Sequence, residues 1–266
     1  MQDPHEHQTP ADPDFAAYAE NNPYTEFMNL SQSLPPVTKY KRKRTGEKIL
    51  LAVCLVALFA IFVLPKIIAH VAKRGHIEYI SSIQELSFAE PVQISTTGEV
   101  IKSVWWTDVK LTKVAEYSIT ARVLRTRDYY GGVKDSLIPV DAALAWGYMA
   151  NEQVDDYIKW SQRNRFYYYR IQNGQWLANI GGLDIIALNS ANCHLIPADA
   201  ETARLIRALR KNDYVKIEGY LVNVYYETGR GRWYSMNTST TRTDTGAGGC
   251  EVILVTGVTW YEVEGD

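Results

Sequence analysis

Apolar and polar residues are distributed unevenly along this 266-residue chain. Residues 49–64 form a run of sixteen without a charged side chain, and after Pro65 and Lys66 three further apolar residues follow. A helix that crosses a bilayer needs about 20 mostly apolar residues. A cleaved signal peptide has only a short segment before its apolar core, whereas 48 residues precede this run. We therefore predict one transmembrane helix over residues 49–69.

The charges on either side of this helix predict its orientation. Six basic residues precede the apolar run and three follow it, and the side richer in Lys and Arg normally stays in the cytoplasm. The N-terminus is therefore expected in the cytoplasm, and the C-terminal part in the periplasm if the membrane is a bacterial inner membrane. The basic residues are Lys39, Lys41, Arg42, Lys43, Arg44 and Lys48 on the first side, and Lys66, Lys73 and Arg74 on the second.

The segments around the helix differ in composition. Residues 1–38 carry acidic residues and several prolines but no Lys or Arg, which predicts a disordered acidic tail. Residues 39–48 form a basic juxtamembrane segment that can also touch anionic lipid headgroups. A stalk is expected over 70–87 and one soluble domain over 88–266. Four aromatic residues of the tail could dock on a cytoplasmic partner, although a solvated tail with incidental aromatics is the favoured interpretation: Phe15, Tyr18, Tyr24 and Phe27.

The domain combines strand and helix patterns. Gly219 and Gly257 lie inside two expected strands, where glycine commonly marks a bend. Because strands and helices do not alternate as βαβ units, we predict an α+β fold with a strongly bent sheet or a small OB-like β-barrel and helical insertions. The expected strands are 116–124, 165–171, 214–226 and 251–263, and the expected helices are 139–150, 152–160 and 199–209, the last capped by Asp199.

The charge of the domain argues against nucleic acid as a partner. From Gly75 onward, 19 Lys and Arg stand against 23 Asp and Glu. A net negative domain is a poor partner for phosphate backbones. Arg230, Arg232 and Trp233 could stack on bases, but sheet surface is the favoured interpretation. A nuclease or nucleic-acid binder on an OB-like barrel would need the opposite topology and a local basic groove.

Asp244 begins a tetrapeptide that is typical of one enzyme class. The sequence Asp-Thr-Gly-Ala occurs in retroviral-type aspartic proteases, where the aspartates of two copies share a proton. This chain has one copy, which follows a polar stretch rather than an apolar strand. A glycine-rich turn that Asp initiates explains the motif better.

His194 and Cys250 suggest a thiol nucleophile with a histidine partner. One membrane anchor, an exported β domain and these two residues are superficially similar to a sortase. Those enzymes also require an arginine shortly after the cysteine, and none follows Cys250. The favoured interpretation is a structural cysteine and a histidine that fixes the loop before Pro197. The enzyme alternative predicts that His194, Asp244 and Cys250 converge in one cleft.

The cysteines allow one disulfide in the domain. Cys54 lies in the apolar run and is expected to pack as a small hydrophobic side chain. Cys193 and Cys250 are the only pair beyond it and could bond in an oxidising compartment. No metal site is expected, because the adjacent Cys193 and His194 would point to opposite faces of a strand and no other pair has ligand spacing. No cofactor is expected either.

Five segments resemble a family of uncharacterised bacterial proteins with one membrane anchor. They are YSITARVL at 117–124, PVDAALAWG at 139–147, SANCHLIPA at 190–198, VKIEGYLV at 215–222 and STTRTDTGAGGCE at 239–251. The similarity covers about half of the chain, residues 116–251, and supports the domain boundaries without implying an activity. In that family Met often stands where Cys193 stands here, so the resemblance does not imply a family-wide disulfide.

These features together predict a membrane-anchored, non-enzymatic binding or assembly component of a bacterial envelope complex, such as a secretion or conjugation apparatus. The expected partners are the lipid bilayer, other envelope or cytoplasmic proteins, and a second copy of the chain. The alternative is an envelope hydrolase or transpeptidase with a Cys–His site.

Overall fold

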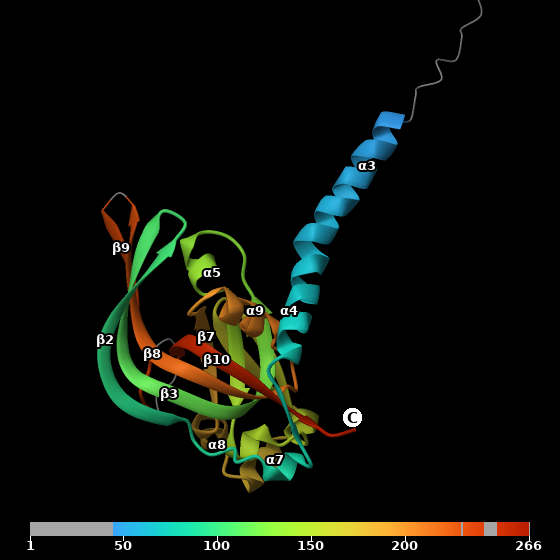
Figure 1. Ribbon diagram of the computed structural model, residues 1–266. Coiled ribbons are helices and arrows are strands. Elements are labelled where there is room, and N and C mark those ends of the chain that lie inside the picture. Colours follow the sequence, from blue (N-terminus) through green and yellow to red (C-terminus); the bar gives the residue numbers. More distant parts are fainter. Residues whose placement is uncertain (1–44, 230, 242–248, 266) are drawn as a thin grey trace, which may run out of the picture. The chain divides into compact units, whose positions relative to one another are not determined.

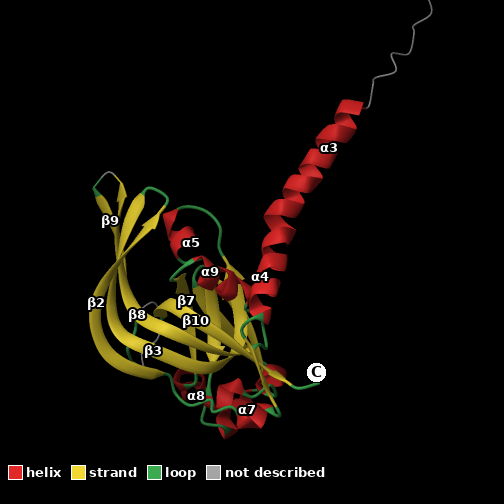
Figure 2. Ribbon diagram, in the orientation of Figure 1, coloured by secondary structure: helices red, strands yellow, loops and turns green. Residues whose placement is uncertain are grey.

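A computed structural model describes residues 45–229, 231–241 and 249–265. The protein is a mixed α+β protein with a large sheet and one long apolar helix (Figures 1 and 2). The chain divides into two compact units between Val53 and Cys54, and the sheet belongs entirely to the second unit.

The described strands are β1 (Ile77–Ile80), β2 (Val92–Val104), β3 (Thr107–Asp128), β4 (Val140–Ala145), β5 (Ile158–Arg163), β6 (Phe166–Ile171), β7 (Ser190–Pro197), β8 (Tyr214–Gly229), β9 (Arg232–Met236) and β10 (Glu251–Val263). The described helices are α3 (Thr45–Leu58), α4 (Leu64–Arg74), α5 (Val133–Leu137), α6 (Val154–Tyr157), α7 (Gly174–Asn179), α8 (Leu183–Leu188) and α9 (Ala200–Ala208), with shorter turns η1 (Phe59–Val63), η2 (Ile83–Glu85) and η3 (Gly147–Ala150).

The long helix consists of α3, the π-helical turn η1 and α4. Within the part of the chain that the structure describes, Glu47–Arg74 is the one helix long and apolar enough to cross a membrane. The π-helical turn directly precedes Pro65, which has no N–H to donate and whose ring clashes with the carbonyl four residues earlier in a regular α-helix. Pro65 therefore accounts for the wider turn.

The C-terminal end of α4 is part of the folded domain. Ala69 is buried in the main core, and α4 packs against α9. Lys73 forms ion pairs with Asp213 (3.4 Å) and Glu262 (3.0 Å). The helix is thus joined to the domain by both apolar and charged contacts.

The expectation of a stalk over residues 70–87 is wrong. Soon after α4 ends, β1 pairs in parallel with the end of β10, from Ile77 opposite Trp260 to Ile80 opposite Val263. A short segment with an exposed, mixed pattern looks like a linker in the sequence, but the unpaired edge of β10 supplies hydrogen-bonding partners for it. The domain therefore begins before residue 88.

The strands join in one large sheet in the order β1-β10-β7-β4-β3-β8-β9, with β2 paired to β3. The pairs β1–β10 and β10–β7 are parallel, and the others are antiparallel. Because β10 pairs with β8 as well as with β7, the path from β10 through β7, β4, β3 and β8 returns to β10. The strands β5 and β6 form a separate two-stranded sheet.

Both glycines expected to mark bends lie at special points of the sheet. At Gly219 on β8 the backbone of β10 comes so close that a Cβ would collide with the carbonyl of Leu254. On β10 the register shifts between Val255 and Gly257, as at a β-bulge. The expected strands over 214–226 and 251–263 are confirmed.

The expected helix over residues 139–150 is wrong. Its first half is the strand β4, whose six residues are all buried, followed by the short turn η3. A strand covered on both faces has an uninterrupted apolar run, which does not differ from that of a buried helix. Leu144 enters the main core and Ala143 a separate apolar cluster that also contains Ile158, so both faces of β4 are covered.

The other expected helices are partly confirmed. The helix over 152–160 shortens to α6, and from Ile158 the chain continues as β5. The helix over 199–209 is α9, where the carboxylate of Asp199 accepts from the Thr202 N–H at 2.8 Å in a capping box. Local capping chemistry was therefore a reliable signal.

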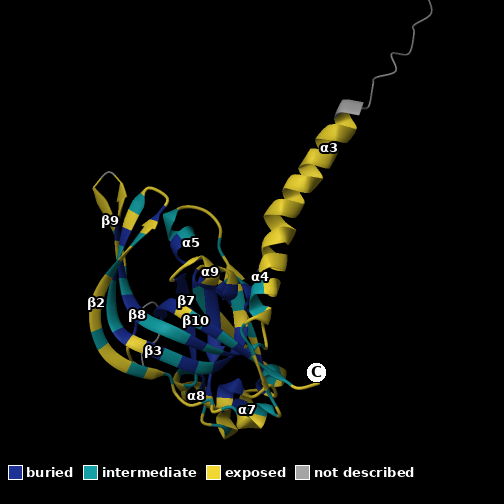
Figure 3. Cartoon of the chain, in the orientation of Figure 1, coloured by how far each residue is buried: buried dark blue, intermediate teal, exposed yellow. Residues whose placement is uncertain are grey.

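Three apolar clusters form the core, and Figure 3 shows the buried residues concentrated along the central strands. The main cluster joins the sheet to α4 and α9. A second cluster includes Ile138, Ile196 and Val252, and a third includes Ala143 and Ile158. On β4, Asp141 lies between residues of the second and third clusters, and this is where the polar site is found.

Candidate functional site

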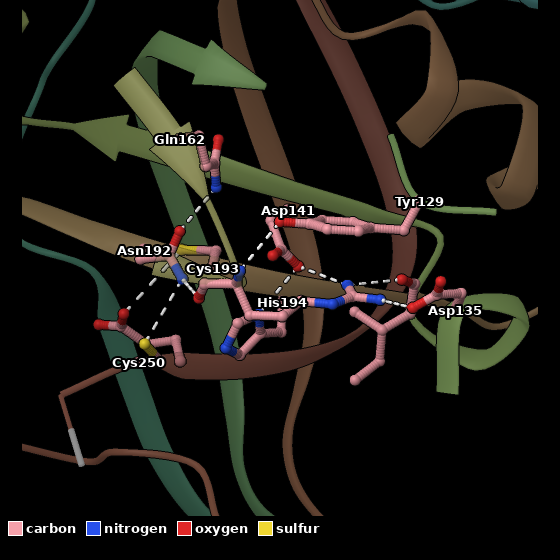
Figure 4. A network of polar contacts seen from close by, with 11 residues as sticks. Tyr129, Asp135, Asp141, Gln162, Asn192, Cys193, His194 and Cys250 are labelled. Carbon is pink, nitrogen blue, oxygen red and sulfur yellow. Dashed lines mark hydrogen bonds and ion pairs between the residues drawn. The ribbon is translucent and has the colours of Figure 1, made fainter. Parts of the chain in front are cut away.

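The site lies on one face of the adjacent strands β4 and β7, beside the start of β10 (Figure 4). All eight residues of β7 are buried, and their side chains alternate between two faces. Cys193 and Leu195 enter the main apolar cluster, whereas Asn192 and His194 face the polar site. The expectation of a loop before Pro197 is thus wrong, because His194 lies in a central strand.

Asp141 holds His194 from the neighbouring strand. The two residues are directly opposite in the antiparallel pair β4–β7, and Nδ1 of His194 is 2.8 Å from Oδ1 of Asp141. Both side chains are buried, so the contact is shielded from water. A carboxylate on one ring nitrogen fixes the orientation of the imidazole and leaves Nε2 for another partner.

The electrostatic surroundings of His194 favour its charged form. Burial alone lowers the pKa of the imidazole, but hydrogen bonds with Asp141 and Cys250 outweigh burial and raise the pKa to about 9. Figure 4 shows the ring between the Asp141 carboxylate and the Cys250 thiol. At neutral pH, His194 is therefore an imidazolium beside a carboxylate and a thiol.

Arg165 reaches the same carboxylate from the turn between β5 and β6. Its guanidinium donates to Asp141 at 3.0 Å, to Asp135 at 2.6 Å and to the carbonyl of Ile138 at 2.8 Å. The guanidinium also lies 3.5 Å from the ring centre of Tyr129. The carboxylates of Asp135 and Asp141 thus lie beside two cations, Arg165 and His194. This pairing offsets the cost of removing these charges from water.

Asn192 connects the thiol to the hairpin. Its Nδ2 donates to the carbonyl of Arg165 at 2.9 Å and lies 3.4 Å from Sγ of Cys250. Its Oδ1 accepts from Nε2 of Gln162 on β5 at 2.7 Å. The network therefore runs continuously from Cys250, directly before β10, through β7 to the β5–β6 hairpin.

The structure brings together two of the three weak catalytic candidates. Cys250 and His194 belong to one network, although both are largely buried. Asp244 lies outside the described residues, as do Phe15, Tyr18, Tyr24 and Phe27 of the tail, so their predicted roles stay predictions.

The expected disulfide is not present in this structure. Cys193 and Cys250 are not bonded to each other. Cys193 faces the main apolar cluster and approaches a Glu251 carboxylate oxygen at 4.0 Å, whereas Cys250 contacts Asn192 on the opposite face. Among the described residues, no three His, Cys, Asp or Glu side chains are placed to hold a metal ion.

Sequence reasoning missed Asp141, Arg165 and Asn192. Asp141 was assigned to the start of a helix, which concealed its position opposite His194. Arg165 was read as the first residue of a strand, although it belongs to an Asn-Arg turn with left-handed backbone at Asn164 (φ 54°) and Arg165 (φ 69°). One signal was available: a lone acidic residue inside an otherwise apolar run needs a buried partner.

A second candidate feature is an exposed aromatic surface at the ends of two hairpins, which we call the aromatic tip. It surrounds a hollow of ≈950 Å³. Its aromatic members are Trp105 (58% exposed), Trp106 (84%), Tyr225 (44%) and Trp233 (58%). Tyr225 and Trp233 stack with ring centres 4.8 Å apart, and Lys110 and Lys134 also line the hollow. Exposed apolar groups in such a cluster are typical of interaction sites.

No protein-family model, no curated protein and no solved structure matches this chain.

Proposed function

We propose that this chain is a single-pass membrane protein whose C-terminal domain is a binding or assembly component of a bacterial envelope complex, such as a secretion or conjugation apparatus. In this proposal it belongs with the single-anchor bacterial proteins that residues 116–251 resemble. The closed path of strand pairings forms a small OB-like barrel. The partners are the bilayer, other envelope or cytoplasmic proteins and a second copy of the chain.

The single observation that carries this proposal is the aromatic tip. Trp and Tyr supply large contact areas at a low cost in side-chain entropy, and they are enriched at the centres of protein interfaces. Trp105 adopts a left-handed backbone (φ 57°), which is costly for a bulky residue, and its side chain nevertheless faces solvent. Large rings gathered on one exposed surface suit the binding of a protein partner.

The aromatic tip is tested by purifying partners with the full-length chain in mild detergent. The double substitution Trp106→Ala and Trp233→Ala is expected to lose co-purifying envelope proteins, because it removes two anchors of the interface. Tyr79→Ala is the matched control, since Tyr79 is also strongly exposed (61%) but lies on β1, outside the aromatic tip. Recovery of the lone chain from the wild type would contradict the proposal.

The proposed location is the inner membrane, with the N-terminus in the cytoplasm and the domain in the periplasm. It rests on the apolar helix and on the excess of basic residues before it. Alkaline phosphatase fused after residue 266 is expected to be active, and a fluorescent protein that folds only in the cytoplasm is expected to be dark. The reverse pattern would place the domain in the cytoplasm.

A further inference from the structure

The polar network around His194 combines a carboxylate, an imidazole and a thiol, a set of groups that a protein-binding surface does not require. A reactive thiol site requires a base beside the sulfur and a third group that orients the base. In this network Asp141 holds Nδ1 of His194 at 2.8 Å, and the ring also interacts with the thiol of Cys250. Asp141 and His194 lie opposite each other on the paired strands β4 and β7, and Cys250 directly precedes β10, the strand next to β7.

We propose that Cys250 is a nucleophile for acyl transfer, with His194 as its proton partner and Asp141 as the residue that positions His194, and that the β5–β6 hairpin is a lid over this thiol. This site goes beyond the binding role and does not depend on it. Its substrate class is an amide or ester of a carboxylic acid.

The other buried cysteine of the domain shows why Cys250 is singled out. Cys193 lies among apolar side chains, with the Glu251 carboxylate at 4.0 Å. Cys250 instead has the His194 ring as a hydrogen-bonding partner and the amide N–H group of Asn192 at 3.4 Å. The two cysteines thus provide an internal comparison within one domain.

The lid is inferred from the way the hairpin is attached. It is a separate two-stranded sheet, and its tip is held over the site by polar contacts: Gln162 to Asn192, Asn192 to the Arg165 carbonyl, and Arg165 to Asp141. Its two turn residues, Asn164 and Arg165, have left-handed backbones, a conformation that residues other than glycine adopt only at an energetic cost. A strained turn attached by exchangeable polar contacts is able to open, while the apolar contacts of Ile158 keep the base of the hairpin in place.

The chemistry needs no group outside the site and the substrate. The proton that the thiol and the imidazole share resides on His194 when Sγ attacks the carbonyl carbon and forms an S–C bond. The C–N or C–O bond of the substrate then breaks, and His194 gives its proton to the departing amine or alcohol. Water, or a second amine, attacks the resulting thioester and returns a proton to the Cys–His pair as the C–S bond breaks.

Opening of the lid also prepares a donor for the oxygen of the attacked carbonyl. In the closed form, Nδ2 of Asn192 donates to the Arg165 carbonyl. When the tip withdraws, this N–H is released 3.4 Å from the sulfur, where it can donate to the developing oxyanion.

The experiment measures acetylation of each cysteine of the full-length chain in mild detergent by p-nitrophenyl acetate, with peptide mass spectrometry as the readout. Cys250 is expected to react at least about tenfold faster than Cys193, and His194→Gln is expected to abolish the difference. Asp141→Asn is expected to change the pH profile of the Cys250 rate. Equal acetylation rates at the two cysteines, or an unchanged Cys250 rate in His194→Gln, would contradict the proposal that Cys250 is a nucleophile with His194 as its proton partner.

The lid has its own test in the same assay. Gln162→Met removes the contact of the tip with Asn192, and Arg165→Lys replaces the guanidinium that contacts Asp135, Asp141 and the Ile138 carbonyl. Both changes loosen the tip, and either is expected to raise the Cys250 rate several-fold. Tryptophan fluorescence identifies the variants that remain folded. Unchanged Cys250 rates in the folded variants would contradict the proposal that the hairpin is a lid. Neither outcome affects the recovery of partners through the aromatic tip.

Discussion

A chain with valine in place of Gly219 is expected to lose about 3 kcal/mol or more of its free energy of unfolding. The reason is the close approach of two strands: a Cβ at Gly219 would meet the carbonyl of Leu254 and the backbone of Val255. Backbone atoms in a paired strand cannot move away as a flexible side chain can. Accommodation would break the β8–β10 pairing that closes the path of strands. The measurement is thermal unfolding of the full-length chain in detergent, followed by tryptophan fluorescence.

Gly257→Ala provides the matched control. Gly257 lies on the opposing strand, and the nearest atom to its missing Cβ is the Glu218 carboxylate at 3.9 Å, an ordinary contact with a mobile side chain. We expect its unfolding midpoint to stay near that of the wild type. Equal destabilisation by the two substitutions would show that loss of glycine flexibility, rather than the close approach at Gly219, limits stability.

The features that the sequence predicted correctly depend on local chemistry. The long helix follows from a continuous apolar run, and α9 follows from the Asp199 cap with apolar spacing behind it. The alternation in 214–226 identified β8 because one face of that strand is less deeply buried than the other. In each case the neighbouring residues alone determine the element.

The features that it predicted wrongly depend on residues distant in the chain. Apart from Asp141, β4 is apolar because the main cluster covers one face and the third cluster the other, and nothing within residues 139–150 carries that information. β1 exists because β10, more than 170 positions later, offers it an edge. Such pairings become visible only when the topology is known.

The candidate site shows the same division. His194 and Cys250 were identified by their chemical types, because few residues can act as a base or a thiol nucleophile. The enzyme alternative grouped them with Asp244, which begins the Asp-Thr-Gly-Ala tetrapeptide, whereas the register of β4 and β7 places Asp141 opposite His194. Arg165 reaches the site through a turn that the sequence does not mark with glycine. The identity of the reactive groups was thus predictable, and their surroundings were not.

The network around His194 makes the stability of the protein depend on pH. The pKa of His194 is raised from 6.5 to about 9 in the folded protein, against the effect of burial, by Asp141 and Cys250. A raised pKa means that the folded state binds the proton more tightly than the unfolded state. The resulting stabilisation is fully present below pH 6.5, declines as the pH rises and is lost above about 9. At roughly 1.4 kcal/mol per unit, it amounts to about 3 kcal/mol.

We therefore expect the unfolding midpoint of the wild type to fall between pH 6.5 and pH 9.5. His194→Gln is expected to have a lower midpoint at pH 6.5 and a much flatter profile, because the glutamine side chain does not titrate. His76→Gln is the matched control: His76 is about one-third exposed and pairs with Glu201 at the surface, where solvent screens the pair, so its profile should follow the wild type.

The outcome distinguishes two descriptions of the same contacts. If the imidazolium is held by Asp141 and the thiol, the slope belongs to His194 and disappears with it. If Arg165 alone neutralises Asp141, His194 is neutral in the folded state and its replacement leaves the slope unchanged. An unchanged slope would show that Cys250 has no imidazolium beside it, which contradicts the proposed role of His194. The pH profile of unfolding therefore tests the thiol chemistry before any substrate is known.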